Sequence, residues 1–245
     1  MSNLFQPPAG QQPFVQVADA DTTRAFLARV FTYMGLAMVI SGVMAWWFGH
    51  DMGMLSYLRN PETGKQTILG WVVLLSPLAL VFVMGGMVNR LSGTAMLGVF
   101  ILYSALTGMS LSYIFLAYTA SSIANIFFIT AALFGVMAFL GYTTKTDLTK
   151  LGSILMIGLI GIVIAGVVNM FLRSSAMGYV ISMISVVIFT GLTAYDMQKL
   201  KGMAGYVVNG TEIAQKMALM GALSLYLDFL NLFLALLRLF GNRRN

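Results

Sequence analysis

Two aspartates in consecutive apolar stretches near the end of the chain are the residues best placed to do chemistry. Asp228 lies in GALSLYLDFLNLFLALLRLFG, residues 221–241, with no other charged residue within nine positions on either side. Asp196 lies in GLTAYDMQKLK, close to the end of the preceding apolar stretch. A charged side chain at the centre of a bilayer costs at least about 2.5 kcal/mol, so such residues face the protein interior and mark functional sites. We therefore take the two aspartates as the first candidate site.

The two carboxylates can hold a proton or a cation between them if their helices bring them together. Neighbouring carboxylates cannot both ionise without a large cost, so such a pair titrates as a unit and can share one proton. The shared proton ties the two helices, whereas two ionised groups repel unless a cation or an arginine compensates. Carboxylate oxygens suit Ca²⁺, but a tight calcium site uses about 6–8 oxygens. The pair therefore predicts a pH-dependent latch and only a weak Ca²⁺ site at Asp196 and Asp228; for Asp196 alone, an interfacial position beside Lys199 is the alternative.

The residues around Asp228 predict a polar face on a helix. Spacings of three and four residues place side chains on one side of a helix, and six small or polar residues follow these spacings: Gly221, Ser224, Asp228, Asn231, Ala235 and Arg238. The positions between them are mainly leucine, phenylalanine and tyrosine. In the preceding stretch Ser182, Ser185 and Thr193 continue the face of Asp196 less regularly. Two such faces in contact would form a polar seam through the protein.

Membrane-spanning helices must position these aspartates. Of the 245 residues, 59% are hydrophobic and only 9% are charged, whereas soluble domains have about 25% charged residues. A bilayer core about 30 Å thick needs roughly 20 apolar residues per helix. Seven stretches qualify, at about 26–48, 68–88, 94–118, 122–142, 151–172, 178–198 and 213–240. Because a membrane β-barrel would show short alternating strands instead, we predict an all-α polytopic membrane protein with seven transmembrane helices.

The ends and loops of the chain predict its domain limits and its topology. Residues 1–23 are rich in Gln, Pro and Gly and lack the basic region of a signal peptide, so we expect a flexible tail there, a transmembrane domain over 24–241 and a short basic tail over 242–245. With seven spans, Arg24, Arg29, Arg90, Lys145, Lys150, Lys199, Lys201 and Lys216 lie on the N-terminal side, and Arg59, Lys65, Arg173, Arg238, Arg243 and Arg244 on the other. The positive-inside rule then predicts a cytoplasmic N-terminus. A re-entrant last segment would instead place both ends on one side.

Composition also excludes several functions. The net charge of +6 comes from basic residues in short loops between apolar stretches, which is typical of membrane topology and not of a nucleic-acid-binding surface. The chain has no cysteine, so it has no disulfide, no thiolate metal site and no cysteine nucleophile. The expected partners are the lipid bilayer and small cations.

Residues 190–241 resemble the signature of the Bax inhibitor-1 (transmembrane Bax inhibitor motif) family, and bacterial members most closely. The resemblance rests on GLTAYDMQKLK followed by ALSLYLDFLNLFLALLRLFG, and the seven spans fit the family over the whole chain. It implies seven helices with the last helix central in the bundle, wrapped by two groups of three, in a bacterial inner membrane. It also implies a pH-sensitive calcium leak, in which Asp196 and Asp228 are the pH sensor and Ca²⁺ is the transported ion without any cofactor.

The same resemblance adds two arginines to the site. Arg90, in MVNR at the end of the second span, matches by position a basic residue that interacts with the aspartate pair. Arg238, in LLRLFG, matches the end of the motif and is a candidate gate or end contact, although the second span holds no acidic residue to pair with it. With Ser224 and Asn231 on the face of the last helix, these residues complete the expected pH sensor and ion path.

Two other functions are open from the sequence. Some bacterial relatives bind and restrain a membrane-bound AAA protease, so the chain could instead be an interaction protein that uses its N-terminal tail for docking. Intramembrane aspartyl proteases of the presenilin type are also similar, because they carry two aspartates in consecutive spans. They have a glycine two residues before the second aspartate and a later Pro-Ala-Leu element, whereas this chain has LYLD over 225–228 and no proline after Pro77. We therefore expect no enzyme.

Overall fold

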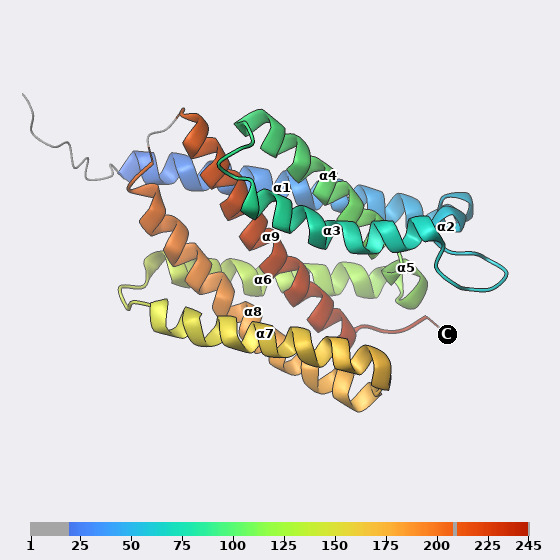
Figure 1. Ribbon diagram of the computed structural model, residues 1–245. Coiled ribbons are helices and arrows are strands. Elements are labelled where there is room, and N and C mark those ends of the chain that lie inside the picture. Colours follow the sequence, from blue (N-terminus) through green and yellow to red (C-terminus); the bar gives the residue numbers. More distant parts are fainter. Residues whose placement is uncertain (1–19, 208–209, 245) are drawn as a thin grey trace, which may run out of the picture.

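The computed structural model describes residues 20–207 and 210–244, which form helices joined by turns and short loops (Figure 1). The long helices are α1 (Ala20–His50), α3 (Ile68–Gly86), α4 (Gly93–Leu111), α6 (Ala120–Thr143), α7 (Thr149–Leu172), α8 (Ser175–Ala204) and α9 (Glu212–Phe240), and the short ones are α2 (Met52–Leu58) and α5 (Ile114–Ala117). Seven segments are long and apolar enough to cross a membrane, with α4 and α5 counted as one. The predicted all-α fold with seven spans is confirmed.

The two ends of the chain differ in detail from the predicted tails. Helix α1 begins at Ala20, so the last residues of the expected N-terminal tail are helical, while residues 1–19 lie outside the described part of the chain. At the other end, the backbone N–H of Thr119 donates to the carbonyl of Asn242 at 3.1 Å, and the N–H of Arg244 donates to the carbonyl of Ala117 at 3.0 Å. The basic C-terminal residues up to Arg244 are therefore held against the α5–α6 connection.

Polar residues at the turns fix where the helices begin. At six helix starts a side-chain oxygen accepts a backbone N–H of the first turn, namely at Asp51, Thr67, Ser92, Thr119, Ser174 and Thr211. Each such cap is worth about 1 kcal/mol. The cap at Asp51 stabilises the start of α2, which lies between the spans predicted at about 26–48 and 68–88.

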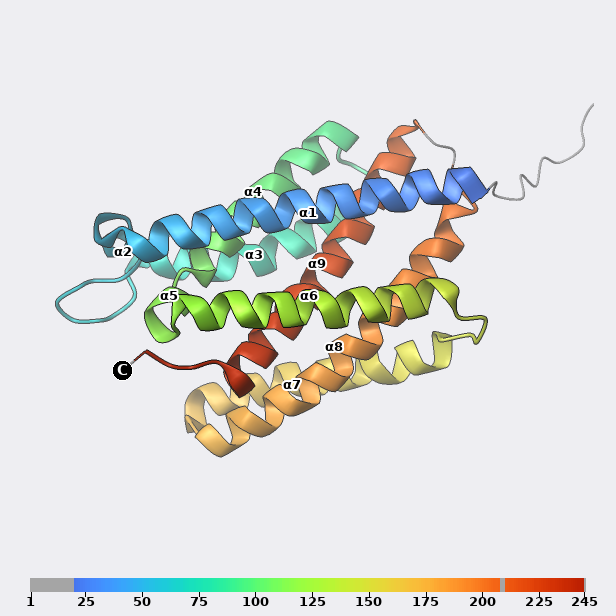
Figure 2. The same cartoon turned by 180° about the vertical axis from the view of Figure 1, so that it is seen from behind.

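Helix α9 is the most enclosed span. Of its most apolar 18 residues 67% are buried, whereas no other span exceeds 33%. Its main neighbours are α1, α4, α6 and α8, and Figures 1 and 2 show it running obliquely between the group α1, α3 and α4 and the group α6, α7 and α8. It is continuous over 29 residues, about 43 Å long, and it ends at the side of the bundle opposite the start of α1 (Figure 1). The last segment is therefore a full span and not a re-entrant one.

Close approach of α8 and α9 depends on a glycine. A Cβ atom added at Gly221 of α9 would lie 2.5 Å from Cδ2 of Leu200 on α8. On the far side of α8, a Cβ at Gly141 of α6 would meet the backbone carbonyl of Ala194. Small residues of this kind let membrane helices pack with their backbones close together. Gly221 lets α9 approach α8 on the face that carries Asp228, and Gly141 lets α6 approach α8.

Candidate functional site

Asp196 and Asp228 lie on the contact between α8 and α9. Asp228 is buried, with 5% of its surface exposed, and Asp196 is half-buried. The two carboxylates interact electrostatically, and within the described residues no direct hydrogen bond joins them. The structure thus brings together the two aspartates that the sequence paired.

Asp228 keeps unused hydrogen-bonding capacity in a buried place. Its Oδ2 atom has no hydrogen-bond partner, and in the described part of the chain the only other such buried side-chain atom is Oγ1 of Thr190 on α8. A buried polar atom left without a partner costs about 1–3 kcal/mol, so native proteins keep few of them and usually for a reason. The contact between α8 and α9 therefore contains a buried carboxylate oxygen that can still accept a hydrogen bond.

A first crevice reaches the site from the end of the bundle where α1 begins. It has a volume of about 240 Å³ and we call it the N-side crevice; it is lined by Asp196, Lys199, Leu200, Met203, Met220, Gly221 and Ser224. Lys199 is exposed and interacts electrostatically with Asp196. Asp196 therefore interacts both with Lys199, the neighbour named in the predicted alternative, and with Asp228. Asp196 faces both the crevice and the second carboxylate.

A second crevice reaches the site from the opposite end. This C-side crevice, of about 280 Å³, is lined by Leu159, Ile162, Val163, Ser182, Ser185, Phe189, Asn231, Leu234, Ala235 and Arg238. Asp228 lines neither crevice. The N-side crevice ends at Ser224 and the C-side crevice begins at Asn231, which is 231 − 224 = 7 residues further along α9 and corresponds to about 10 Å of helix. Asp228 therefore lies in a short barrier between two openings.

The polar groups along the C-side crevice and the barrier are mainly acceptors. The hydroxyls of Ser182, Ser185 and Thr193 each donate to the backbone carbonyl four residues earlier, at 2.9, 2.7 and 2.7 Å. Nδ2 of Asn231 likewise donates to the carbonyl of Leu227 at 2.8 Å. A hydroxyl has one hydrogen and two acceptor lone pairs, so these three hydroxyls offer oxygen acceptors to a ligand. Together with the carboxylates, these oxygens match a hard cation better than an anion, whereas Arg238 and the second amide hydrogen of Asn231 supply donors to the same crevice.

The two predicted arginines lie at opposite ends of the bundle. Arg90 is exposed in the turn after α3, a helix whose main neighbours are α2 and α4. Arg238 is exposed near the end of α9 and lines the C-side crevice. Neither forms a salt bridge with a described residue; the ion pairs found there are Arg24 with Asp21 and Lys216 with Glu212. Among the same residues no group of three or more His, Cys, Asp or Glu could hold a metal ion.

The sequence analysis missed a hydrogen-bonded cluster on the other face of α9. The hydroxyl oxygens of Tyr226 and Ser41 lie 2.5 Å apart, and the Ser41 hydroxyl donates to the carbonyl of Ser104 at 2.7 Å. Because Ser41 has used its hydrogen there, Tyr226 is the donor in their bond. The ring of Tyr103 packs edge-on against that of Tyr226, with centroids 5.6 Å apart. The signal was present in the sequence, since a tyrosine two residues before Asp228 points to the opposite side of a helix.

Seven spans around a buried carboxylate define a polytopic helical membrane protein with an acidic site inside the membrane. The family model described as "Inhibitor of apoptosis-promoting Bax1" matches residues 23–245. The chain is 42% identical over 243 residues to the inner membrane protein YbhL of Escherichia coli K12, covering 99% of this chain and 97% of YbhL. It is 46% identical over 220 residues to a protein of Borreliella burgdorferi, covering 90% and 93%.

The chain therefore belongs to the Bax inhibitor-1 family, as its two aspartate motifs predicted. It is an integral membrane protein, and the inner bacterial membrane is its location.

Proposed function

We propose that the protein is a non-enzymatic, pH-sensitive leak for Ca²⁺, in which the pair of Asp196 and Asp228 holds the path closed. The observation that carries the proposal is the pair of crevices that end on either side of Asp228. A barrier of about 10 Å is short enough for a small change in the contact between α8 and α9 to join the two openings.

The chemistry of the seam favours a cation. The hydroxyls along it donate to their own helix and leave oxygen lone pairs toward the path. Two carboxylates add negative charge, and Ca²⁺ binds carboxylate, hydroxyl and carbonyl oxygens. Because two carboxylates supply far fewer oxygens than a tight calcium site uses, the ion binds weakly and can leave again, which conduction requires.

Protonation of the pair is the proposed gate. When the pair holds a proton, only one negative charge remains between α8 and α9, so the two helices stay in contact and the barrier stays closed. When both are ionised, they repel each other in a medium of low dielectric constant. Separation of the helices then admits water and a cation, which compensates the charge.

Calcium flux into proteoliposomes that contain a calcium indicator tests this proposal. We expect the wild-type protein to leak Ca²⁺ at a rate that changes between about pH 5 and 8, and both Asp196→Asn and Asp228→Asn to remove most of that pH dependence. Asp147→Asn is the matched control, because Asp147 is an exposed carboxylate in the turn between α6 and α7. A flux that ignores both seam substitutions over this pH range, or no flux from folded protein, would overturn the proposal.

The same assay separates a leak from a protein that only docks a membrane-bound protease. The expected docking segment is the N-terminal tail, residues 1–23, of which residues 1–19 lie outside the described part of the chain. A variant lacking residues 2–20 should keep the flux and its pH dependence if the seam carries the function. Loss of partner binding with unchanged flux would show that the tail has a separate role.

A further inference from the structure

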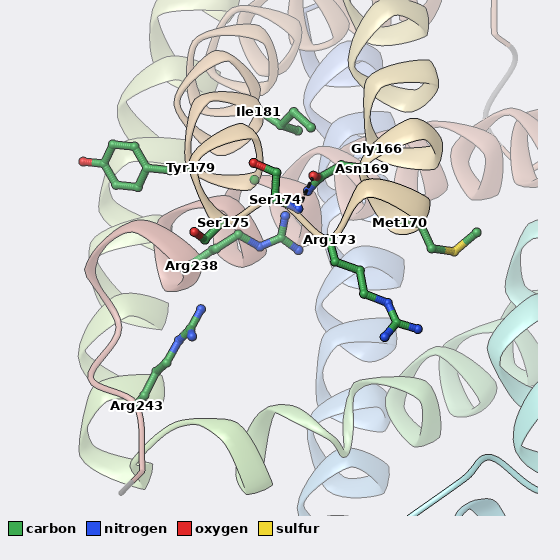
Figure 3. A pocket seen from close by; sticks show the side chains of 11 residues that line it. Gly166, Asn169, Met170, Arg173, Ser174, Ser175, Tyr179, Ile181, Arg238 and Arg243 are labelled. Carbon is green, nitrogen blue, oxygen red and sulfur yellow. Dashed lines mark hydrogen bonds between the residues drawn. The ribbon is translucent and has the colours of Figure 1, made fainter.

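A large cavity at the C-terminal end of the bundle has a chemistry opposite to that of the seam. It has a volume of about 600 Å³ and we call it the arginine cavity; it is lined by Gly166, Asn169, Met170, Arg173, Ser174, Ser175, Gly178, Tyr179, Ile181, Arg238 and Arg243. These residues come from the end of α7, the turn after it, the start of α8, the end of α9 and the C-terminal segment. Figure 3 shows Arg238 reaching toward Asn169 and Ser174, Arg243 pointing toward Arg238, and Arg173 turned outward from the turn.

Among the described residues, the charged groups that line the arginine cavity are all positive. Three arginines line it and no aspartate or glutamate does. Within the described residues none of the three forms a salt bridge. Guanidinium groups that gather without a carboxylate are arranged for an anion from outside, and arginine matches a phosphate with two parallel hydrogen bonds.

The neutral groups of the cavity are free to donate. Oδ1 of Asn169 accepts the backbone N–H of Ser174 at 3.1 Å, which leaves the amide NH₂ of Asn169 for a ligand. Oγ of Ser174 accepts the N–H of Met177 at 3.3 Å, so its hydroxyl hydrogen is also available. Arginine side chains, an amide and a hydroxyl therefore present hydrogens to the cavity, whereas the hydroxyls of Ser182, Ser185 and Thr193 on α8 present lone pairs.

The surroundings of the cavity are apolar and face the membrane. The last residues of α7 are strongly exposed, with Met170 at 62%, Phe171 at 77% and Leu172 at 64%, and Met170 itself lines the cavity. A ligand that matches both the arginines of the cavity and the exposed apolar end of α7 has an anionic head and an apolar tail. We propose that the arginine cavity binds the phosphate headgroup of an anionic phospholipid, whose acyl chains lie along the exposed end of α7. Its volume is within the range of about 300–1,000 Å³ that small-molecule sites occupy.

Native mass spectrometry of the full-length protein in a non-ionic detergent tests this site. The probe is an equal mixture of phosphatidylglycerol and phosphatidylcholine with the same acyl chains. We expect the wild-type protein to retain phosphatidylglycerol preferentially, and the double variant Arg238→Gln/Arg243→Gln to retain it roughly ten-fold less or lower still. Retention of phosphatidylcholine should not change. Arg244→Gln is the matched control for the single variant Arg243→Gln, because each removes one positive charge and Arg244 is an exposed neighbour that does not line the cavity.

Two results would overturn the proposal. One is an equal loss of phosphatidylglycerol in Arg244→Gln and in the single variant Arg243→Gln, because binding would then follow net charge and not the cavity. The other is a rise of the unfolding temperature with inorganic phosphate that equals the rise with phosphatidylglycerol and disappears in the double variant. That result would assign the cavity to free phosphate. The unfolding temperature of each variant without ligand confirms that it is folded, and because the assay measures binding, its outcome is independent of calcium flux.

Discussion

The two faces of α9 hold buried polar groups in opposite ways. On one face the Tyr226 hydroxyl donates to Ser41, which passes its own hydrogen to the carbonyl of Ser104. On the other face Asp228 lies between two crevices, and its Oδ2 atom has no partner. Both residues are buried in one helix and two positions apart. The contrast indicates that α9 is fixed on one face to α1 and α4, while the other face keeps capacity for a ligand.

The same contrast predicts which helices can move relative to each other. Shifting α9 against α1 would break hydrogen bonds that run between helices. Shifting α8 against α9 would leave the hydroxyls of Ser182, Ser185 and Thr193 bonded, because each donates within its own helix. A bonded network resists separation, since a buried donor that loses its partner costs about 1–3 kcal/mol. Opening of the proposed path is therefore expected between α8 and α9.

The largest expected effect comes from a substitution that pushes α4 away from α1, the two helices that bind the Tyr226 face of α9. A Cβ atom at Gly108 of α4 would lie 2.5 Å from the backbone carbonyl oxygen of Ser41 on α1, and backbone cannot move aside easily. We expect Gly108→Ala to lower the free energy of unfolding by about 3 kcal/mol. Thermal unfolding of the purified protein in detergent measures this.

Gly98→Ala, on the same helix, is the control for that measurement. A Cβ at Gly98 meets no atom within 4 Å, and alanine favours helix over glycine, so stability should stay equal or rise slightly. Equal losses in the two variants would show that the contact of α1 and α4 is not tight.

A pair of substitutions on α9 should change stability in opposite directions. Tyr226→Phe removes the hydrogen bond to Ser41 and should cost about 1 kcal/mol. Asp228→Leu removes a buried polar group with an unpaired oxygen and should stabilise the protein by about 1 kcal/mol while it abolishes pH-dependent flux. Unfolding temperatures and flux of both variants measure the contrast. Destabilisation by both substitutions would mean that Asp228 is hydrogen-bonded as fully as Tyr226. The two faces of α9 would then not differ in how they hold buried polar groups.

The parts of the structure that could be predicted are those that leave a local pattern in the sequence. The spans are set by long apolar runs, so their number and approximate limits could be read from composition. The polar stripe through Asp228 could be read because helical spacing is local. The two crevices beside this stripe could not be predicted, because their position depends on which residues of α7 and α8 face Ser224 and Asn231. Pairing between helices leaves no local pattern.

The arginine cavity and the tyrosine cluster show the same limit. Arg173 is far from Arg238 and Arg243 in the sequence. Arg173 and Arg243 were informative only as charges for topology, and Arg238 was expected to be a gate or end contact and not part of an arginine cluster. Ser41 and Tyr226 are 185 positions apart, and neither is unusual in its own stretch. The roles of the glycines could not be predicted either. Gly98 and Gly108 lie in the same predicted span, but of these two only Gly108 is packed against another helix. Such contacts become visible only when the helices are placed.

The smallest expected effect concerns Asp147, whose carboxylate, unlike that of Asp228, lies in water and has partners. Hydrogen bonds from the side chain and backbone of Thr149 lower the pKa of Asp147 below its ordinary value near 3.8, and the backbone bond measures 2.9 Å at the start of α7. A carboxyl whose folded pKa is depressed adds stability above its unfolded pKa and loses it as pH falls through the folded pKa. We therefore expect Asp147→Asn to lower the unfolding temperature slightly at pH 7 and to have no effect once the pH is below the folded pKa. Unfolding curves of wild type and variant at the two pH values measure this, and a difference that persists in acid would show that Asp147 acts through shape and not through its charge.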